Sequence, residues 1–156
     1  MLGITLATTL LMAWGATGAA DTKAGPACDA SVEGSRTLVV AFYTEALVEK
    51  RVRDGFERYV SPDLVEHKPD VPAGGRAVVV DFLEGIVKDV PDARWEIIRT
   101  IAEKDLVFLH ARFTPAPGAP AYALADVFRV ENCRIVEHWD VVEPPRGKMP
   151  NTNSRF

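Results

Sequence analysis

The chain has 156 residues, of which 47% are hydrophobic and 26% are charged, and its formal net charge is −4. These values fit one globular domain with a buried core, and they exclude a disordered chain and a collagen-like sequence. The mild acidity disfavours a nucleic-acid-binding protein, which usually carries a basic patch. We therefore expect no nucleic-acid partner.

The N-terminal segment, residues 1–20, contains no charged side chain. An apolar stretch from Leu2 to Trp14 is followed by small residues, and Gly18 and Ala20 stand where a signal-peptidase site needs them. We predict a signal peptide over residues 1–20 and a secreted or periplasmic protein. Because no Lys or Arg precedes the stretch, the alternative is an unprocessed extension or a misassigned start, with the protein in the cytoplasm. The stretch is shorter than the roughly 20 residues of a membrane-spanning helix, so we expect no stable membrane span.

The remaining residues divide into a small, polar linker over 21–34, one domain over 35–142 and a polar tail over 143–156. Ser35 is the predicted N-cap of a first helix, which places Leu38, Phe42 and Ala46 on one apolar stripe. Three further segments follow, namely a helix over 52–60, an extended piece over 64–67 and a Pro-rich loop over 68–75. A third helix over 76–88 has a broad apolar face and ends before Pro91.

After Pro91 the hydrophobic period changes to two, which predicts four strands, over 94–103, 106–113, 121–130 and 134–142. Helices followed by an antiparallel meander predict an α+β domain. We expect one strongly curved sheet wrapped against the first helix, with a pocket on its concave face.

Candidate site residues follow from the alternation of the strands. One face of the third strand carries Asp126 among apolar residues, and one face of the fourth carries His138 and Asp140, with Ile135, Glu137, Trp139 and Val141 on the other face. If the hairpin pairs Val130 with Arg134, Asp126 lies opposite His138. The pocket face then also takes Tyr122 and Phe128, and His110 from the second strand. His67, in the loop above the sheet, is a further pocket candidate.

A carboxylate among apolar side chains is desolvated, which raises its pKa toward the working pH. A neighbouring imidazole can relay the proton or donate to a developing oxyanion. We therefore predict that Asp126, His138 and Asp140 abstract a proton next to a carbonyl group, with either Asp126 or Asp140 as the acid–base group. The alternative is a structural Asp–His hydrogen bond.

Other chemistries have weak support. His138 and Asp140 could share a metal ion, but the third ligand would have to be His67 or His110, so we expect no metal site. The sequence has no Gly-rich phosphate loop, no nucleophile elbow and no CxxC pair, and we expect no cofactor.

The run from Asp126 to Asp140, DVFRVENCRIVEHWD, resembles the closing hairpin of the SnoaL-like branch of the nuclear transport factor 2-like superfamily. Further similar segments are Tyr59–His67 with the following loop, Ala102–Val107 and the tail Asn151–Phe156, so the resemblance spans about Ser35 to Phe156. It implies a cone-like α+β roll, a pocket for a small-molecule substrate at the open end, and a homodimer formed through the sheet.

The polyketide cyclases of this family close rings by intramolecular aldol condensation with a pocket Asp and His and without a cofactor. The resemblance therefore implies a small-molecule enzyme that performs cofactor-free aldol or isomerisation chemistry. Because relatives on the same fold include non-catalytic modules, the alternative is a secreted ligand-binding or accessory protein. His67 matches a family His, but the residue after it, commonly Asn, is Lys68 here. Lys104 and Cys133 occupy turn positions where the family usually has Gly.

If the chain is exported, we predict a disulfide between Cys28 and Cys133; in the cytoplasm both would be thiols. The bond would offset the roughly 1 kcal/mol cost of Cys133 in a left-handed turn, and closing so long a loop is expected to stabilise by about 2–4 kcal/mol. Alkylation of the unfolded, exported protein should label neither cysteine before reduction and both after it. Labelling of both without reductant would contradict the prediction.

Overall fold

The computed structural model describes residues 29–148 and 150–156, so the predicted signal peptide and Cys28 lie outside the described residues. The helical elements are α1 (Val32–Tyr43), a π-helical turn η1 (Thr44–Val48), α2 (Val52–Tyr59) and α3 (Gly75–Asp89). The strands are β1 (Val60–Glu66), β2 (Arg94–Glu103), β3 (Leu106–Thr114), β4 (Tyr122–Glu131) and β5 (Arg134–Glu143).

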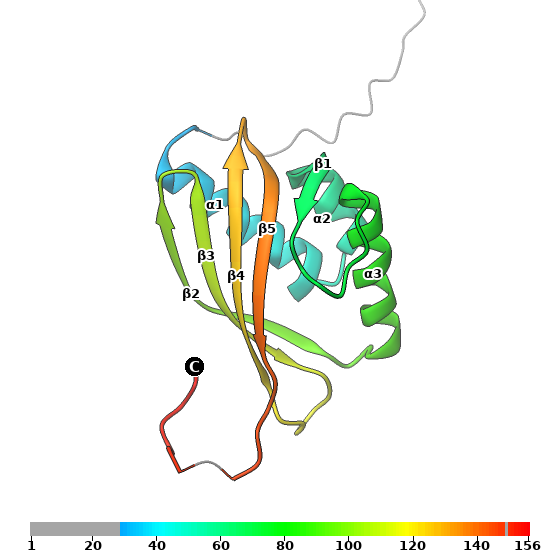
Figure 1. Ribbon diagram of the computed structural model, residues 1–156, viewed down its shortest axis with the longest axis vertical. Helices are drawn as coiled ribbons and strands as arrows, with labels where there is room; N and C mark the ends of the chain where they lie inside the picture. The colour runs from blue at the N-terminus through cyan, green and yellow to red at the C-terminus, as the bar shows by residue number, and fades with distance from the viewer. Residues whose placement is uncertain (1–28, 149) are drawn as a thin grey trace, which may run out of the picture.

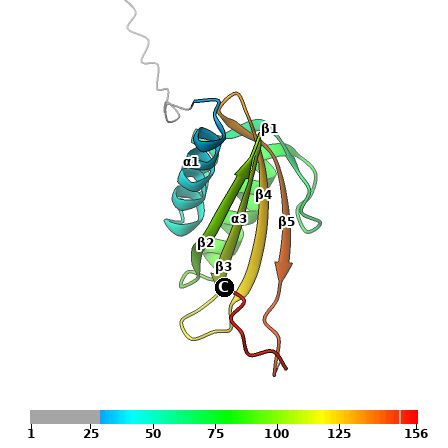
Figure 2. The ribbon, with the colours of Figure 1, turned by 90° about the vertical axis from the view of Figure 1, so that its left-hand side faces the viewer.

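The strands form one sheet in the order β1-β5-β4-β3-β2, in which β1 is parallel to β5 and the other pairs are antiparallel (Figure 1). Helix α1 lies along one side of the curved sheet, whereas α2 and α3 stand beside β1 (Figures 1 and 2). The predicted α+β architecture, with a curved sheet against the first helix, is confirmed.

Helix α1 begins at Val32, ahead of the predicted start. Ser31 is its N-cap, because its backbone is extended and its side chain accepts a hydrogen bond of 3.0 Å from the Gly34 amide. The prediction that Ser35 is the cap is therefore wrong. Ser35 lies inside the helix and is buried.

The core forms where α1 and α2 meet the inner face of the sheet. Phe42 is central, since its ring lies 5.0 Å from that of Phe56 and 5.8 Å from that of Phe128, both in edge-on geometry. On β3, Val107, Leu109 and Ala111 are fully buried. This apolar alternation decides which face of β3 turns inward.

The β4–β5 hairpin differs from the predicted register. Its two-residue turn, Asn132 and Cys133, has positive φ at both positions and pairs Glu131 with Arg134, and a bulge then leaves Val136 without a partner on β4. As a result Asp126 lies opposite Asp140, and Phe128 lies opposite His138. The predicted pairing of Val130 with Arg134, and of Asp126 with His138, is therefore wrong.

The bulge also changes one face assignment. Ile135, predicted to face outward, is buried, because the extra residue turns both Ile135 and His138 to the inside. Asp126, His138 and Asp140 nevertheless stay on one face, as predicted, because the slip in register is by an even number of residues.

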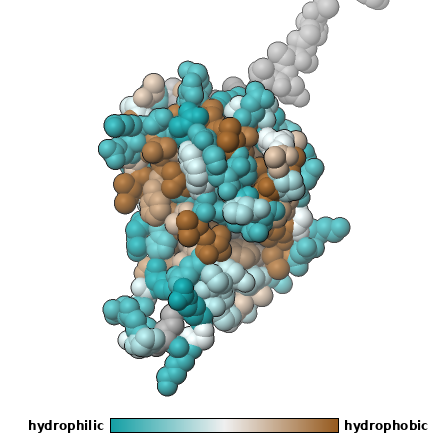
Figure 3. All heavy atoms as spheres, viewed as in Figure 1, coloured by the Kyte–Doolittle hydropathy of each residue, from teal (hydrophilic) through white to brown (hydrophobic). Residues whose placement is uncertain are grey.

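The C-terminal tail returns to the outer face of the sheet. Phe156 stacks on His110 at 5.9 Å and lies under the Arg112 guanidinium at 4.2 Å. Arg155 donates a hydrogen bond of 2.6 Å to the Ala121 carbonyl. In the view of Figure 3 the surface is largely hydrophilic, with hydrophobic side chains scattered over it. None of the helices in the described ranges has the length and hydrophobicity needed to cross a membrane.

Gly55 allows α2 to approach η1 closely, because a Cβ atom on it would lie 2.8 Å from the Ala46 Cβ. We expect Gly55→Ala to lower the free energy of unfolding by about 1–3 kcal/mol through overpacking. Gly85→Ala in α3 is the matched control: a Cβ there meets nothing within 4 Å, so the substitution should stabilise by about 0.5–1 kcal/mol. Urea denaturation measures both values, and equal effects of the two substitutions would contradict the packing argument.

Candidate functional site

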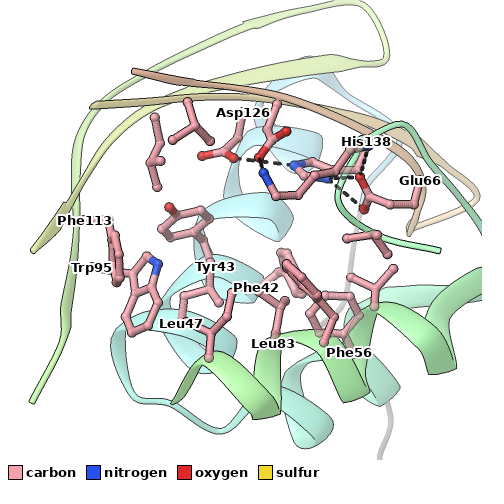
Figure 4. Close-up of a pocket in the computed structure, with 18 of the residues that line it drawn as sticks. Phe42, Tyr43, Leu47, Phe56, Glu66, Leu83, Trp95, Phe113, Asp126 and His138 are labelled. Atoms are coloured by element: carbon pink, nitrogen blue, oxygen red, sulfur yellow. Dashed lines mark hydrogen bonds and ion pairs between the residues drawn. The ribbon is translucent and has the colours of Figure 1, made fainter. Parts of the chain in front are cut away.

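A cavity of about 490 Å³ lies between the sheet and the helices (Figure 4). Its lining is mainly apolar and aromatic, including Phe42, Leu47, Phe56, Leu83, Trp95, Phe113, Tyr122, Leu124 and Phe128. A cavity of this size suits a small organic ligand.

Apart from Asp89 at the end of α3, the charged side chains of the cavity gather at its sheet side, where Tyr43 of α1 also presents its phenol. β4 supplies Asp126 and β5 supplies His138 and Asp140, while β1 supplies Glu66 and α1 supplies Tyr43. Lys68, just after β1, also lines the cavity. The parallel pairing of Glu66 with His138 brings the end of β1 against β5.

His138 lies between two carboxylates. Its Nδ1 hydrogen-bonds to Glu66 at 2.9 and 3.0 Å, and its Nε2 is 3.5 Å from Asp126 Oδ1. Burial alone would lower the pKa of His138, but its interactions with Asp126 and Glu66 outweigh burial and raise the pKa to about 9. Burial raises the pKa of Glu66, but the hydrogen bond and charge of His138, together with the backbone amides of Lys68 and His67, outweigh burial, so that this pKa is lowered. His138 is therefore an imidazolium at neutral pH.

Asp126 and Tyr43 each present a buried oxygen without a hydrogen-bond partner among the described residues, namely Oδ2 of Asp126 and the phenol oxygen of Tyr43. The phenol points toward Asp126 (Figure 4). Burial, and next the charge of Asp126, raises the pKa of Tyr43 well above its usual value, so the phenol stays a donor. Buried polar atoms of this kind are rare in folded proteins and cost free energy until they are satisfied. A ligand group that accepts from Tyr43 and meets the Asp126 carboxylate would satisfy both.

Of the residues predicted from the sequence, Asp126, His138, Asp140, Tyr122 and Phe128 line the cavity. The structure thus brings the three predicted catalytic side chains to one wall.

The prediction that His67 and His110 line the pocket is wrong, because neither residue lines the cavity. β3 pairs Leu109 with Asp126, so Leu109 lies on the inner face of the sheet and His110 faces outward, where it hydrogen-bonds to Arg99 at 3.0 Å. His67 stacks on Trp139 with ring centroids 4.8 Å apart and hydrogen-bonds to Glu137 at 2.9 Å, also on the outer side of the sheet.

Three cavity residues were missed by the sequence reasoning: Tyr43, Glu66 and Lys68. Tyr43 follows Phe42 in the first helix, and the hydroxyl of a tyrosine in an apolar helix face, which needs a polar partner once buried, is the signal that could have found it. Glu66 precedes His67 in a short extended piece, where alternation puts the two on opposite faces. Lys68 was noticed only because it departs from the family pattern.

No group of three or more His, Cys, Asp or Glu residues in the described ranges is arranged to hold a metal ion. Cys133 does not carry a free thiol, and Cys133 and Lys104 both have positive φ, at 59° and 55°. The predicted partner of Cys133, Cys28, lies outside the described residues, so the Cys28–Cys133 bond stays a prediction.

The family model of the SnoaL-like domain matches residues 39–138, which include Asp126 and His138. The chain belongs to the SnoaL-like family. It is similar to several solved structures that have the same fold. No curated protein matches it.

AclR from Streptomyces galilaeus, named a "putative hydroxylase", is 25% identical, with a TM-score of 0.61, covering 72% of this chain and 91% of AclR. A "putative polyketide cyclase" from Acidithiobacillus ferrooxidans is 20% identical, with a TM-score of 0.59, covering 70% of this chain and 87% of that protein. IdmH from Streptomyces antibioticus, also named a "putative polyketide cyclase", is 21% identical, with a TM-score of 0.57, covering 69% of this chain and 91% of IdmH. The names differ in chemistry, so the SnoaL-like fold leaves the reaction open.

The charge of His138 makes stability depend on pH. Its pKa is about 9 in the folded protein against 6.5 for an ordinary histidine. Its contribution to the free energy of unfolding is therefore complete below about pH 6.5 and is lost as the pH rises through 9. We expect urea denaturation to show this loss, and ring NMR signals of His138 to titrate near 9.

Glu66→Gln should lower the pKa of His138 and flatten that pH dependence, because one of the two charged partners is removed. Glu96→Gln is the control, since Glu96 pairs with Arg112 at 2.9 Å away from the cavity. An ordinary pKa for His138 in the unmodified protein, or an equal effect of the two substitutions, would refute the ion-pair array.

Proposed function

We propose that the protein is a SnoaL-like enzyme that performs cofactor-free acid–base chemistry on a carbonyl compound, of the aldol cyclisation or isomerisation type. The observation that carries this proposal is the free oxygen of Asp126, which is buried against an apolar cavity large enough for a small organic molecule. A carboxylate in such surroundings is poorly solvated and positioned to take a proton from carbon.

In this proposal Asp126 removes a proton from the carbon next to the substrate carbonyl and later returns it. The electron pair of the C–H bond forms a carbon–carbon double bond, and the π pair of the carbonyl group moves onto its oxygen, so that the substrate becomes an enolate. In this scheme His138 does not contact the substrate. Its Nε2 faces Oδ1 of Asp126 at 3.5 Å and leaves Oδ2 for the substrate. The phenol of Tyr43, which stays protonated, is a donor for the developing oxyanion on the same side of the cavity.

Glu66 is a positioning residue in this scheme. Its two oxygens hold His138 Nδ1 and thereby fix the orientation and charge of the ring. The backbone amide of Lys68 donates to Glu66 Oε1 at 2.8 Å, which in turn fixes the carboxylate.

The lining supports a compact, mostly apolar substrate, because aromatic and aliphatic side chains make up most of the wall and the polar groups gather on one side. Two similar structures are named "putative polyketide cyclase", which is compatible with a ring-forming reaction on a polyketide. At 20% and 21% identity they support the fold and not the substrate.

We also propose export and a homodimer. Export is supported by the pattern of residues 1–20 and by Cys133, which carries no free thiol. A homodimer through the sheet is supported by hydrophobic side chains exposed on its strands, among them Ile101 at 61% and Val141 at 70%.

Hydrogen–deuterium exchange of 2-tetralone in D₂O tests the acid–base proposal without knowledge of the natural substrate. The unmodified protein should accelerate exchange at the carbon next to the carbonyl, and Asp126→Asn should reduce that acceleration by at least about 100-fold, since a general base contributes roughly 10²–10⁴. The fold should persist, because the amide is isosteric.

Asp92→Asn, in an exposed turn, is the matched control and should exchange like the unmodified protein. Full exchange in Asp126→Asn would refute the role of Asp126. Tight binding of 2-tetralone without any exchange would favour the alternative, a non-catalytic ligand-binding module.

A further inference from the structure

Lys68 is the cation of the cavity that no step above uses. Its side chain is 19% exposed and lines the cavity from the segment after β1, and its Nζ donates to Asp140 Oδ2 at 2.7 Å. Asp70, the second acid near it, is 3.8 Å away, too far for a hydrogen bond. An ammonium has three N–H donors, so Asp140 leaves Lys68 with donors to spare.

His138, the other cation, is flanked by two carboxylates. Both of its ring nitrogens face carboxylates, Nδ1 toward Glu66 and Nε2 toward Asp126. Its charge is therefore directed into the protein. Nε2 makes no hydrogen bond within the described residues, but it faces the Asp126 carboxylate that serves as the base, whereas Lys68 is held by Asp140.

The balance of charges on this wall changes when the proton is transferred, and it leaves the enolate in need of a cation. Glu66, Asp126 and Asp140 are opposed by two cations, His138 and Lys68. When Asp126 takes a proton, one negative charge moves onto the substrate oxygen, and Glu66 and Asp140 then match the two cations. The enolate is left as the single unmatched charge, in surroundings of low dielectric where a cation is most effective.

The sheet register places Lys68 beside the base. Asp140 is the direct cross-strand partner of Asp126, and directly opposed side chains on one face are about 5 Å apart at Cβ. By holding Lys68 at 2.7 Å, Asp140 fixes the ammonium on the same wall as the proton-accepting carboxylate.

We infer that Lys68 is a catalytic residue whose ammonium, oriented by Asp140, binds the carbonyl oxygen of the substrate and the enolate that forms from it. The inference rests on the proposed function and deepens it, since it selects apolar ketones and 1,3-dicarbonyl compounds whose oxygen is directed toward the Lys68 ammonium. Asp126 accepts the proton from carbon, the C–H electron pair forms the carbon–carbon double bond of the enolate, and the carbonyl π pair moves onto the oxygen, which Lys68 stabilises without losing its own proton.

Binding of 2-naphthol, an aromatic analogue of the enol of 2-tetralone, tests this role without turnover. The experiment uses Asp126→Asn, in which a neutral amide stands for the protonated acid, and follows the ionisation of bound naphthol by absorbance across pH. We expect naphthol bound to the single variant Asp126→Asn to have a lower pKa than naphthol bound to the double variant Asp126→Asn, Lys68→Met. The difference should be at least about one unit, which is a tenfold change in the ionisation equilibrium. Lys68→Arg should restore part of the difference.

Lys88→Met, a change at an exposed lysine of α3, is the matched control in the same background and should leave the bound pKa unchanged. Equal ionisation with and without Lys68 would overturn the inference. If the variant with Lys68→Met does not fold, the single variant Asp126→Asn still tests the inference. If that variant binds only neutral naphthol across the pH range in which free naphthol ionises, the inference is also overturned.

The two proposals fail separately. Loss of the exchange reaction in the unmodified protein refutes the acid–base function but leaves a Lys68-dependent naphthol pKa as evidence for an anion-binding lysine. Exchange that depends on Asp126, together with a naphthol pKa that is independent of Lys68, supports the function and overturns the role of Lys68.

Discussion

The ion pairs around His138 are the interaction on which the site depends. Burying a single carboxylate or imidazolium costs several kcal/mol, and the cost is met only when opposite charges and hydrogen bonds compensate it. Glu66, His138 and Asp126 form such an array, and Asp140 with Lys68 forms a second pair beside it. Because each charge is held by another, the polar wall stays fixed next to an apolar cavity.

The array leaves three buried atoms on this wall without a hydrogen-bond partner among the described residues, namely Asp126 Oδ2, the Tyr43 phenol oxygen and His138 Nε2. A mainly apolar cavity with unsatisfied polar atoms at this spot discriminates in favour of ligands that bring a polar group to it. Binding and proton transfer are therefore expected to use the same few atoms.

The backbone that presents this array is governed by local features of the β4–β5 hairpin. The positive-φ turn at Asn132 and Cys133 and the bulge at Val136 together turn Ile135 and His138 inward. Strand alternation alone predicted the common face of Asp126, His138 and Asp140 correctly, but it could not predict the bulge. The error in register left that face intact because it was an even slip.

The sequence by itself determined the order of helices and strands, the α+β class and the face that carries Asp126, His138 and Asp140, because these follow from periodicity within single segments. Only the tertiary structure decided which residues join them. Glu66 and Lys68 reach His138 and Asp140 through the parallel pairing of β1 with β5, and His67 and His110 turn outward because Glu66 and Leu109 take the inner face. Such contacts between distant segments depend on strand order and register, which no local pattern specifies.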